Sequence, residues 1–400
     1  MINGLKGWSD QGYWSDEHYW SDQANTLMKI IFGMKRIILI ILLSGTYLEG
    51  FSQAPSVKNQ DIKFYGRDYF LLEGTAFPDS VKENPYDRMP ASYKDKVRPE
   101  VWNLSKNSAG LSVRFMTNST RISLKWDLLN NMSMNHMAET GIKGVDLYFN
   151  NNGTWQFLNT GRPTGKENEA QLISHMSRKM REYRMFLPLY DGVVKLEIGI
   201  DSTCVIRKPE PMGRRPIVFY GTSITQGGCA SRPGMAHTNI ISRKLNTDCY
   251  NFGFSGNGRM EAPVAQLIAG IDAWFYVIEC LPNMSYEQVL KNTIPLAETI
   301  RKAHPETPII FVDNPMYDAA SLDDTLRFSI GRKNAGLKNE FNKLQAKGIG
   351  NIYYIENSTA PVNDHEGEVD GVHLTDLGFM RYADFLISKF EEFGLVEEDK

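Results

Sequence analysis

The sequence has no surplus of either charge. Its 400 residues include 44 Lys and Arg against 47 Asp and Glu, which gives a formal net charge of −3 at pH 7. Binding to nucleic acid or to an anionic membrane surface relies on a basic excess, so we expect neither as a partner. The hydrophobic fraction of 42% is ordinary for a folded protein, and the length is natural for two domains.

Cysteine is also scarce, with only 4 residues. Cys204, Cys229, Cys249 and Cys280 include no CxxC pair, so their spacing does not suggest a zinc site. Three of them, Cys204, Cys249 and Cys280, border apolar runs and are predicted to be buried free thiols. Cys229 lies in a glycine-containing loop, where a free thiol and a disulfide are both compatible with the sequence.

Near the N-terminus, the apolar run of residues 37–43 is too short to span a bilayer. It follows the basic residues 34–36 and precedes small and polar residues up to Ala54, an order typical of a secretory signal peptide cleaved near Ala54. We therefore expect export to the periplasm or the extracellular space, without stable membrane insertion after cleavage. An uncleaved membrane anchor is the alternative interpretation.

Upstream of the basic stretch, residues 1–33 contain Trp-Ser-Asp three times, at intervals of six residues. So short a repeat has no partner repeats with which to build a core. We interpret it as a non-functional extension and expect the true start at Met28 or Met34. A carbohydrate-binding aromatic strip is the alternative.

Residues 60–205 alternate between apolar and polar side chains, as in Ile122, Leu124 and Trp126. Turn signals at residues 150–153 and 191–192 separate such runs. Short alternating strands at this spacing predict an antiparallel β-sandwich. Three prolines and five charges in residues 207–216 then indicate an interdomain linker.

Beyond the linker, short apolar runs alternate with helical patterns, which predicts a parallel sheet covered on both faces. The expected strands are 217–220, 250–252, 273–278, 309–312 and 352–355, and the expected helices are 238–245, 261–269, 286–303, 326–347 and 376–393. The predicted organisation is an extension with signal peptide (1–54), a β-sandwich (60–205), a linker (206–216) and an α/β catalytic domain (217–395).

Parallel sheets bind ligands at the carboxyl ends of their strands, and two candidate sites follow from this rule. Ser223 comes directly after the first strand, between glycines that allow a sharp turn, but a serine needs a neighbouring base to act as a nucleophile. Asp370 precedes His373 by three residues, so one helical turn would place both side chains on one face, where the carboxylate can orient the imidazole. The alternatives are a serine helix cap and a surface loop.

Two further strand ends offer hydrogen-bond donors. Gly256 follows the second strand and can present an unhindered backbone N–H, and Asn283 follows the third and can present its amide. Acyl transfer requires donors of this kind, because negative charge develops on the carbonyl oxygen. Both residue types are also common in turns, which is the alternative interpretation.

Together these sites resemble the sequence blocks of the SGNH (GDSL-type) hydrolases over roughly residues 214–395. The resemblance implies a flavodoxin-like three-layer fold and a triad of Ser223, His373 and Asp370. It also implies an oxyanion hole from the backbone N–H groups of Ser223 and Gly256 and the amide of Asn283. The first block here reads Gly-Thr-Ser instead of Gly-Asp-Ser, and the third reads Leu-Pro-Asn, a variant that the family contains. Residues 144–148 resemble the Gly-x-Asp-Leu-Tyr signature of a β-sandwich found ahead of bacterial SGNH domains.

A metal site is the rival interpretation of the loop around residue 370. His365, Glu366 and Glu368, with Asp370 and His373, contain metal-ligand types, but the spacing is not His-Glu-x-x-His, and we predict neither a metal nor another cofactor.

Two other histidines lie near the candidate site in sequence. His237 is expected at the surface near the turn that carries Ser223, and contact with the substrate is the alternative. The methionine-rich loop that carries His136 is expected either to reach over the site or to pack at the domain interface.

The function implied by the resemblance is that of an exported carboxylic ester hydrolase, which we expect to deacetylate a carbohydrate. A glycan or small-molecule ester is the expected substrate. The alternatives are a lipase, thioesterase or acyltransferase of the same fold, or a glycan-binding protein that has lost catalysis.

Overall fold

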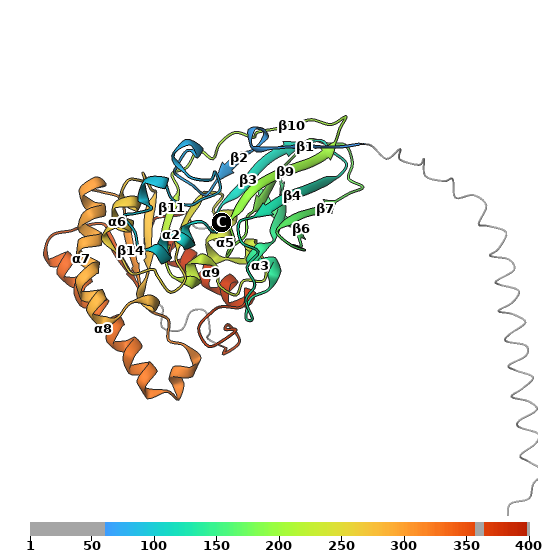
Figure 1. Ribbon diagram of the computed structural model, residues 1–400. Helices are drawn as coiled ribbons and strands as arrows, with labels where there is room; N and C mark the ends of the chain where they lie inside the picture. Colours follow the sequence, from blue (N-terminus) through green and yellow to red (C-terminus); the bar gives the residue numbers. More distant parts are fainter. Residues whose placement is uncertain (1–60, 357–363, 398–400) are drawn as a thin grey trace, which may run out of the picture. The chain divides into compact units, whose positions relative to one another are not determined.

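The computed structural model describes residues 61–356 and 364–397 (Figure 1). The predicted signal peptide, the Trp-Ser-Asp repeats and the alternative start sites lie outside the described residues. Within the described ranges, no helix combines the length and the apolar character needed to cross a membrane.

Two antiparallel sheets make up the N-terminal part of the described chain, as the alternating pattern predicts. One sheet has the strand order β1 (Ile62–Tyr65), β9 (Val193–Asp201), β4 (Ile122–Leu128), β7 (Glu167–Ile173). The other has the order β10 (Ile206–Arg207), β3 (Ser112–Thr117), β8 (Arg181–Phe186), β5 (Val145–Asn151), β6 (Thr154–Gly161), with β2 (Leu71–Glu73) also paired to β3. Inward-facing apolar residues of both sheets, such as Phe115 and Trp126, form one buried core between them.

The C-terminal part is built on a five-stranded parallel sheet. Its strand order is β12 (Cys249–Gly253), β11 (Ile217–Gly221), β13 (Phe275–Glu279), β14 (Ile309–Val312), β15 (Ile352–Ile355). This order is that of a flavodoxin-like fold, so the predicted fold class is confirmed for both parts.

Helices cover both faces of the parallel sheet. The longer ones are α5 (His237–Lys244), α6 (Ala262–Ala269), α7 (Tyr286–Ala303), α8 (Asp324–Ala346) and α9 (Asp376–Glu392). Side chains of α6, α7 and α8 pack on one face, and those of α5 and α9 pack on the other. The remaining short elements are α2 (Pro99–Ser105), α3 (Glu139–Lys143), α4 (Ser223–Gln226), η1 (Arg67–Tyr69), η2 (Asp79–Val81), η3 (Ala91–Tyr93), η4 (Pro233–Met235), η5 (Leu281–Asn283) and η6 (Asp318–Ser321).

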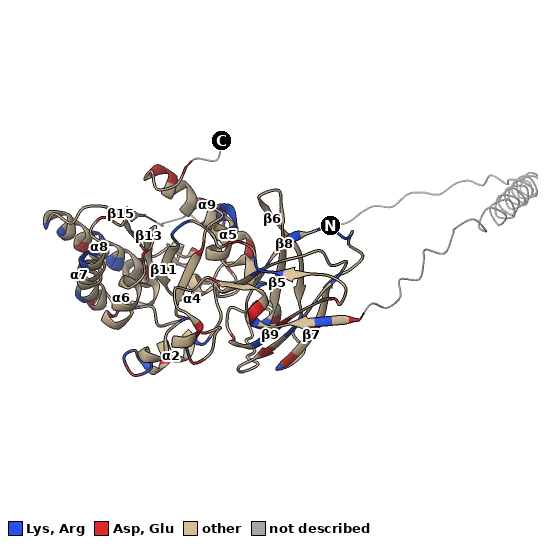
Figure 2. Cartoon of the chain, turned by 90° about the horizontal axis from the view of Figure 1, so that it is seen from above, with Lys and Arg blue, Asp and Glu red and all other residues tan. Residues whose placement is uncertain are grey.

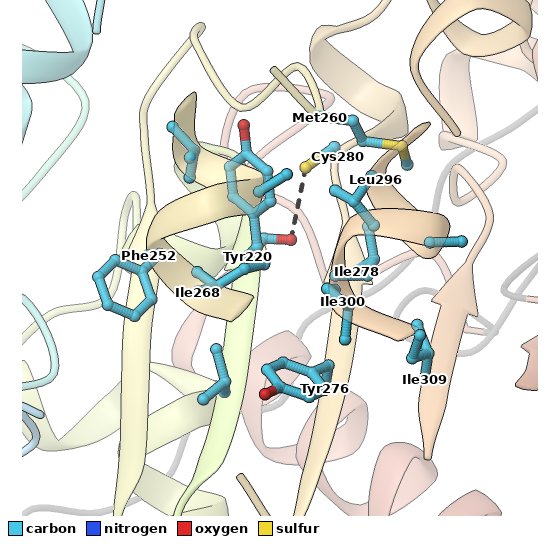
Figure 3. Close-up of a cluster of buried hydrophobic side chains, with 14 of the residues drawn as sticks. Tyr220, Phe252, Met260, Ile268, Tyr276, Ile278, Cys280, Leu296, Ile300 and Ile309 are labelled. Atoms are coloured by element: carbon cyan, nitrogen blue, oxygen red, sulfur yellow. Dashed lines mark hydrogen bonds between the residues drawn. The ribbon is translucent and has the colours of Figure 1, made fainter. Parts of the chain in front are cut away.

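The strands of this sheet are apolar along their whole length because they are covered twice. In β11, Val218 and Tyr220 point to the α6–α7–α8 face, while Ile217 and Phe219 point to the α5–α9 face. Figure 3 shows the first of these clusters, in which the Cys280 thiol lies 3.5 Å from the Tyr220 carbonyl oxygen. Because both faces of these strands are buried, the strands appear in the sequence as continuous hydrophobic runs.

The same core receives side chains from residues that precede the sandwich strand β3. Met89, Val101 and Trp102 are buried within the α6–α7–α8 cluster. Next to them, the buried Arg88 donates from Nη1 to the carbonyl oxygens of Asn251 (2.9 Å) and Gly253 (2.8 Å) at the end of β12. The N-terminal sandwich part and the parallel sheet are therefore joined by shared packing as well as by the connecting segment.

All four cysteines are free and buried. The prediction for Cys204, Cys249 and Cys280 is confirmed, and Cys229 proves to be a free thiol as well. In Figure 2 the chain positions of basic and acidic residues are interspersed, in keeping with the balanced composition.

Candidate active site

The register of the parallel sheet brings three of the predicted blocks to one edge. Gly221 at the end of β11 pairs with Gly253 of β12 on one side and with Glu279 of β13 on the other. Ser223, Gly256 and Asn283 follow these three positions by two, three and four residues. Their common location results from the sheet, because the carboxyl ends of parallel strands meet at one edge.

Ser223 is the first residue of the four-residue helix α4 and is 6% exposed. The cap of this helix is Thr222, whose hydroxyl accepts from the Ile224 N–H, while Thr225 completes a reciprocal capping box. Because the Thr222 hydroxyl caps the helix, the Ser223 hydroxyl is not needed as a cap. Gly227 ends the helix in the left-handed region, with φ of +103°, where glycine costs least.

Asp370 and His373 lie in a tight loop, not in the helical turn that their spacing suggested. The loop is closed by the bridge between Glu368 and Leu374, and α9 begins only at Asp376. One carboxylate oxygen of Asp370 accepts from the backbone N–H of His373 at 2.8 Å, which folds the loop back on itself. A short polar side chain that bonds nearby backbone favours such a turn over a helix. The predicted cap of α9 by Thr375 is confirmed, since its hydroxyl accepts from the Gly378 N–H.

The structure brings Ser223, His373 and Asp370 together in one chain of contacts. His373 Nε2 lies 2.8 Å from Ser223 Oγ, and His373 Nδ1 lies 2.8 Å from Asp370 Oδ2. Burial tends to raise the pKa of Asp370, but the hydrogen bonds and the charge of His373 outweigh it and hold that pKa below its ordinary value. Asp370 is therefore an ionised acceptor at neutral pH.

Gly228 makes room for this arrangement. A Cβ atom at Gly228 would lie 2.8 Å from the Tyr190 hydroxyl oxygen and 3.0 Å from Cδ2 of His373. Any larger residue would press on the imidazole, so the second glycine of the Gly-Gly pair is needed for close approach. The sequence pattern indicated only a turn at this point.

Asn283 and Gly256 lie on neighbouring loops at the same edge. The side-chain oxygen of Asn283 accepts from the Gly258 N–H at 3.3 Å, which turns the NH₂ group of Asn283 away from Gly258. Gly256 has φ of +68°, and a Cβ at Gly258 would lie 2.0 Å from the Gly221 carbonyl oxygen. Glycine at 256 and 258 thus permits a backbone path that runs close to the nucleophile turn.

A buried polar network lies beneath the turn that carries Ser223. It was not predicted from the sequence. Glu279 accepts from Thr225 Oγ1 (3.1 Å) and from the Tyr382 hydroxyl (2.5 Å), and lies 3.2 Å from His237 Nε2. His237 is fully buried, so the expectation of a surface position was wrong. The signal available in the sequence was a carboxylate at the end of an otherwise apolar strand, since buried charges require polar partners.

Beside this network lies a cavity of about 20 Å³. Its lining includes Thr222 and Ile224 on either side of Ser223, Leu374 next to His373, and Pro282 next to Asn283. A space of this size holds a single water-sized group.

Two residues from outside the predicted set lie against His373. The ring of His136, from the loop before α3, has its centroid 5.8 Å from that of His373, so the methionine-rich loop does reach the site. Ligand-type atoms of His136, Cys229, Asp370 and His373 all lie within 4.8 Å of one another. Burial, and then the charge of Asp370, raise the pKa of the Cys229 thiol to about 12, so this thiol is protonated at neutral pH.

The rival metal constellation does not assemble as the sequence suggested. His365 Nδ1 instead pairs with Asp318 Oδ1 at 2.7 Å, on η6. Among the described residues, the group with metal-ligating atoms contains neither His365 nor Glu366 nor Glu368.

The Gly-x-Asp-Leu-Tyr segment joins the sandwich to the loop that follows the nucleophile turn. Asp146 is fully buried, pairs with Arg232 at 2.7 Å and accepts from the Gly234 N–H at 2.8 Å. The Tyr148 hydroxyl lies 2.6 Å from the Arg232 guanidinium. The signature therefore serves to fix residues 232–234 against the sandwich.

A parallel sheet with this order, preceded by a β-sandwich, is the fold that the resemblance to the SGNH-type hydrolases implied. The profile of the GDSL-like lipase/acylhydrolase family matches residues 214–391, and that of the GxDLY N-terminal domain of SGNH-type esterases matches residues 62–206. The chain is 34% identical to a Bacteroides ovatus protein described as a GDSL-like lipase, with a TM-score of 0.81 over 85% of this chain and 100% of that one. The chain thus belongs to the GDSL-like lipase/acylhydrolase family, and membership implies esterase or acylhydrolase activity.

Two more distant structures share the fold. A salicylyl-acyltransferase from a tetracycline biosynthetic pathway is 13% identical, with a TM-score of 0.70 over 84% of this chain and 98% of that one. A family two carbohydrate esterase from Clostridium thermocellum, solved with cellohexaose, is 14% identical, with a TM-score of 0.53 over 72% and 94%. No curated protein sequence matches the chain.

Proposed function

We propose that this protein is a serine esterase in which Ser223 is the nucleophile, His373 the general base and Asp370 the residue that orients His373. The observation that carries the proposal is the pair of 2.8 Å contacts from His373 to Ser223 Oγ and to Asp370 Oδ2. A serine hydroxyl becomes an effective nucleophile when a base accepts its proton, and a carboxylate can hold that base in the required tautomer.

The reaction proceeds in two balanced steps. As Ser223 Oγ bonds to the ester carbonyl carbon, its proton moves to His373 Nε2, and that proton then passes to the alcohol oxygen as the ester C–O bond breaks. Water next attacks the acyl-enzyme, gives its proton to His373 and releases the acid while Ser223 regains its hydrogen. The backbone N–H groups of Ser223 and Gly256 and the NH₂ group of Asn283 stabilise the carbonyl oxygen as it becomes negative.

The proposed substrate is an acetyl ester of a carbohydrate. The cavity of about 20 Å³ is lined by chain neighbours of Ser223, His373 and Asn283, and so small a recess favours a short acyl group over a long chain. A carbohydrate esterase is among the proteins with a similar fold, which fits a sugar as the alcohol part. For such a substrate we also propose export through the signal segment at residues 34–54, and domain boundaries at residues 60–205 and 217–395.

The catalytic assignment is tested by Ser223→Ala. We expect the rate of acetyl ester hydrolysis to fall by about 10⁴-fold or more, because triad residues act as a unit. Asn283→Ala should lower kcat by about 10²–10³-fold through loss of one oxyanion donor. Circular dichroism and the melting temperature control for folding. Wild-type activity in Ser223→Ala would overturn the assignment.

Substrate class is tested by comparing acetate release from acetylated sugars with acid release from esters of longer chains. We expect a marked decline in kcat/KM beyond acetyl, because the proposed acyl site is small. A preference for long chains would instead identify a lipase, and transfer of the acyl group to an acceptor other than water would identify an acyltransferase.

A further inference from the structure

Four potential metal ligands from three chain segments meet beside the nucleophile. His136 belongs to the sandwich part, Cys229 follows the nucleophile turn, and Asp370 and His373 belong to the loop before α9. One ligand atom from each lies within 4.8 Å of the other three. The esterase reaction described above uses Asp370 and His373 but has no role for His136 or for Cys229.

The three segments are tied to one another close to these ligands. The Thr140 hydroxyl of α3 donates to the Ser231 carbonyl oxygen at 2.6 Å, and the Ser231 N–H donates to the Asp376 carboxylate at 2.9 Å. A Cβ at Gly141 would lie 2.1 Å from the Ala230 carbonyl oxygen, so α3 lies directly on the loop that carries Cys229. The ligand set is therefore held together by the fold before any ion binds.

The donor atoms match zinc in kind and nearly match it in spacing. Two imidazole nitrogens, a thiolate and a carboxylate are the ligands that Zn²⁺ takes, whereas Mg²⁺ and Ca²⁺ require oxygen. Tetrahedral coordination at zinc–nitrogen and zinc–sulfur distances would place ligand atoms about 3.3–3.8 Å apart. The widest separation must then close by about 1 Å, which small rotations of the partly exposed His136 and the exposed Asp370 can supply.

We propose that His136, Cys229, Asp370 and His373 form a binding site for Zn²⁺, and that zinc bound there inhibits the esterase. As the zinc–sulfur bond forms, the thiol proton of Cys229 leaves to solvent, and the thiolate and carboxylate charges balance the ion. Zinc coordinated by Asp370 and His373 breaks at least one of two contacts of the imidazole. One is the contact with Asp370, which orients the ring, and the other is the contact with Ser223, which the reaction uses. The inhibitory part of this inference rests on the proposed function, whereas the binding part does not.

Zinc binding is measured first without reference to activity. Zn²⁺ alone is titrated into the purified full chain in competition with a chromophoric chelator. We expect one ion per chain, the same affinity in Ser223→Ala, and at least about tenfold weaker binding in Cys229→Ser and in His136→Gln, each of which removes a ligand. Cys204→Ser and His365→Gln are matched controls that should bind as wild type. Unchanged affinity in Cys229→Ser would overturn the site.

Inhibition is measured next with an acetyl ester. Zinc should inhibit the wild type and EDTA should restore the rate. Cys229→Ser and His136→Gln should keep a basal rate within about twofold of wild type, while their inhibition constants rise in parallel with the binding constants. Equal inhibition of these variants and the wild type would show that zinc acts elsewhere and would overturn the inference. If Cys229-dependent binding occurs in a chain without hydrolytic activity, the proposed function fails and the site stands.

Discussion

The turn that carries Ser223 and the loop that carries Asp370 and His373 differ in burial and in the contacts that hold them. Every residue from 221 to 230 is buried, whereas of residues 364–373 only Gly367 is buried. The turn is fixed by the sheet edge, by the capping box of Thr222 and Thr225, and by Glu279 beneath it. The loop is held mainly by a short bridge and by hydrogen bonds to the carboxylate of Asp370.

This contrast predicts that substitutions in the two regions affect stability and activity differently. Substitutions in the turn disturb buried hydrogen bonds and should therefore reduce the free energy of unfolding along with activity. Substitutions in the loop expose little new surface and leave the core intact, so they should reduce activity while stability stays nearly constant. The following four predictions test this division, in order of decreasing expected effect.

Asp370→Asn should have the largest effect, and on activity alone. We expect kcat/KM to fall by about 10³–10⁴-fold, because an amide cannot hold His373 in the tautomer that accepts the serine proton. Thermal melting should change little. Asp364→Asn is the matched control, since Asp364 is an exposed aspartate of the same loop that pairs with Arg381. A collapse of the melting temperature in Asp370→Asn would contradict the division.

Thr225→Val should act on stability from the turn side. The substitution keeps the shape of the side chain but removes its bonds to the Thr222 N–H and to Glu279. Leaving these buried groups without partners should cost about 2–3 kcal/mol of unfolding free energy in urea. Thr299→Val, on the half-exposed face of α7, provides the control and should cost under about 0.5 kcal/mol. Equal losses in both variants would refute the role of the buried network.

Gly228→Ala joins the two regions, because Gly228 belongs to the buried turn and a Cβ added there would lie 3.0 Å from Cδ2 of His373. The added methyl group should displace the imidazole from Ser223 and lower kcat by about tenfold, with a smaller change in KM. Gly165→Ala is the control, since a Cβ there meets nothing within 4 Å. An unaltered kcat in Gly228→Ala would indicate that the ring tolerates movement.

Glu368→Gln should have the smallest effect, visible only in the pH dependence of stability. Burial, and then the charge of Asp318, raise the pKa of Glu368 to about 7 in the folded state. The folded state thus binds more protons than the unfolded state between the ordinary carboxyl pKa and 7, and stability falls as pH rises through this window. Removing the charge should recover about 1 kcal/mol or less at pH 8, allowing for solvent screening. Glu366→Gln, an exposed neighbour, should keep the wild-type slope of melting temperature against pH.

Much of the fold followed from the sequence because the sandwich strands alternate, the parallel strands are continuous apolar runs and the helices have a helical period. The predicted strand 309–312 and the predicted helix 286–303 coincide with β14 and α7. The juxtaposition of Ser223, Gly256 and Asn283 followed from the rule for parallel strand ends. The role of each of these residues stays a prediction until the variants above are measured.

What sequence reasoning missed depends on contacts between segments far apart in the chain. His237 is buried against Glu279 and Tyr382, which lie on two other elements far away in the sequence. The local sequence pattern does not show which distant elements pack together. The spacing of Asp370 and His373 fitted a helical turn and a surface loop equally, because spacing alone cannot distinguish a helical turn from one closed by a carboxylate. For the loop of His136, the sequence left two expected positions open, and only the packing of the sandwich against the sheet places His136 beside His373.

The shared packing of residues 88–102 bears on how such a protein can be inherited. Trp102 fills part of the core of the parallel sheet, and Arg88 supplies donors to two carbonyl oxygens at the end of β12. A recombination event that moved only the sheet into another gene would expose apolar surface and remove the Arg88 donors from these two carbonyl oxygens. The two halves of this chain are therefore expected to have been transmitted through evolution as a single unit and not exchanged as separate modules.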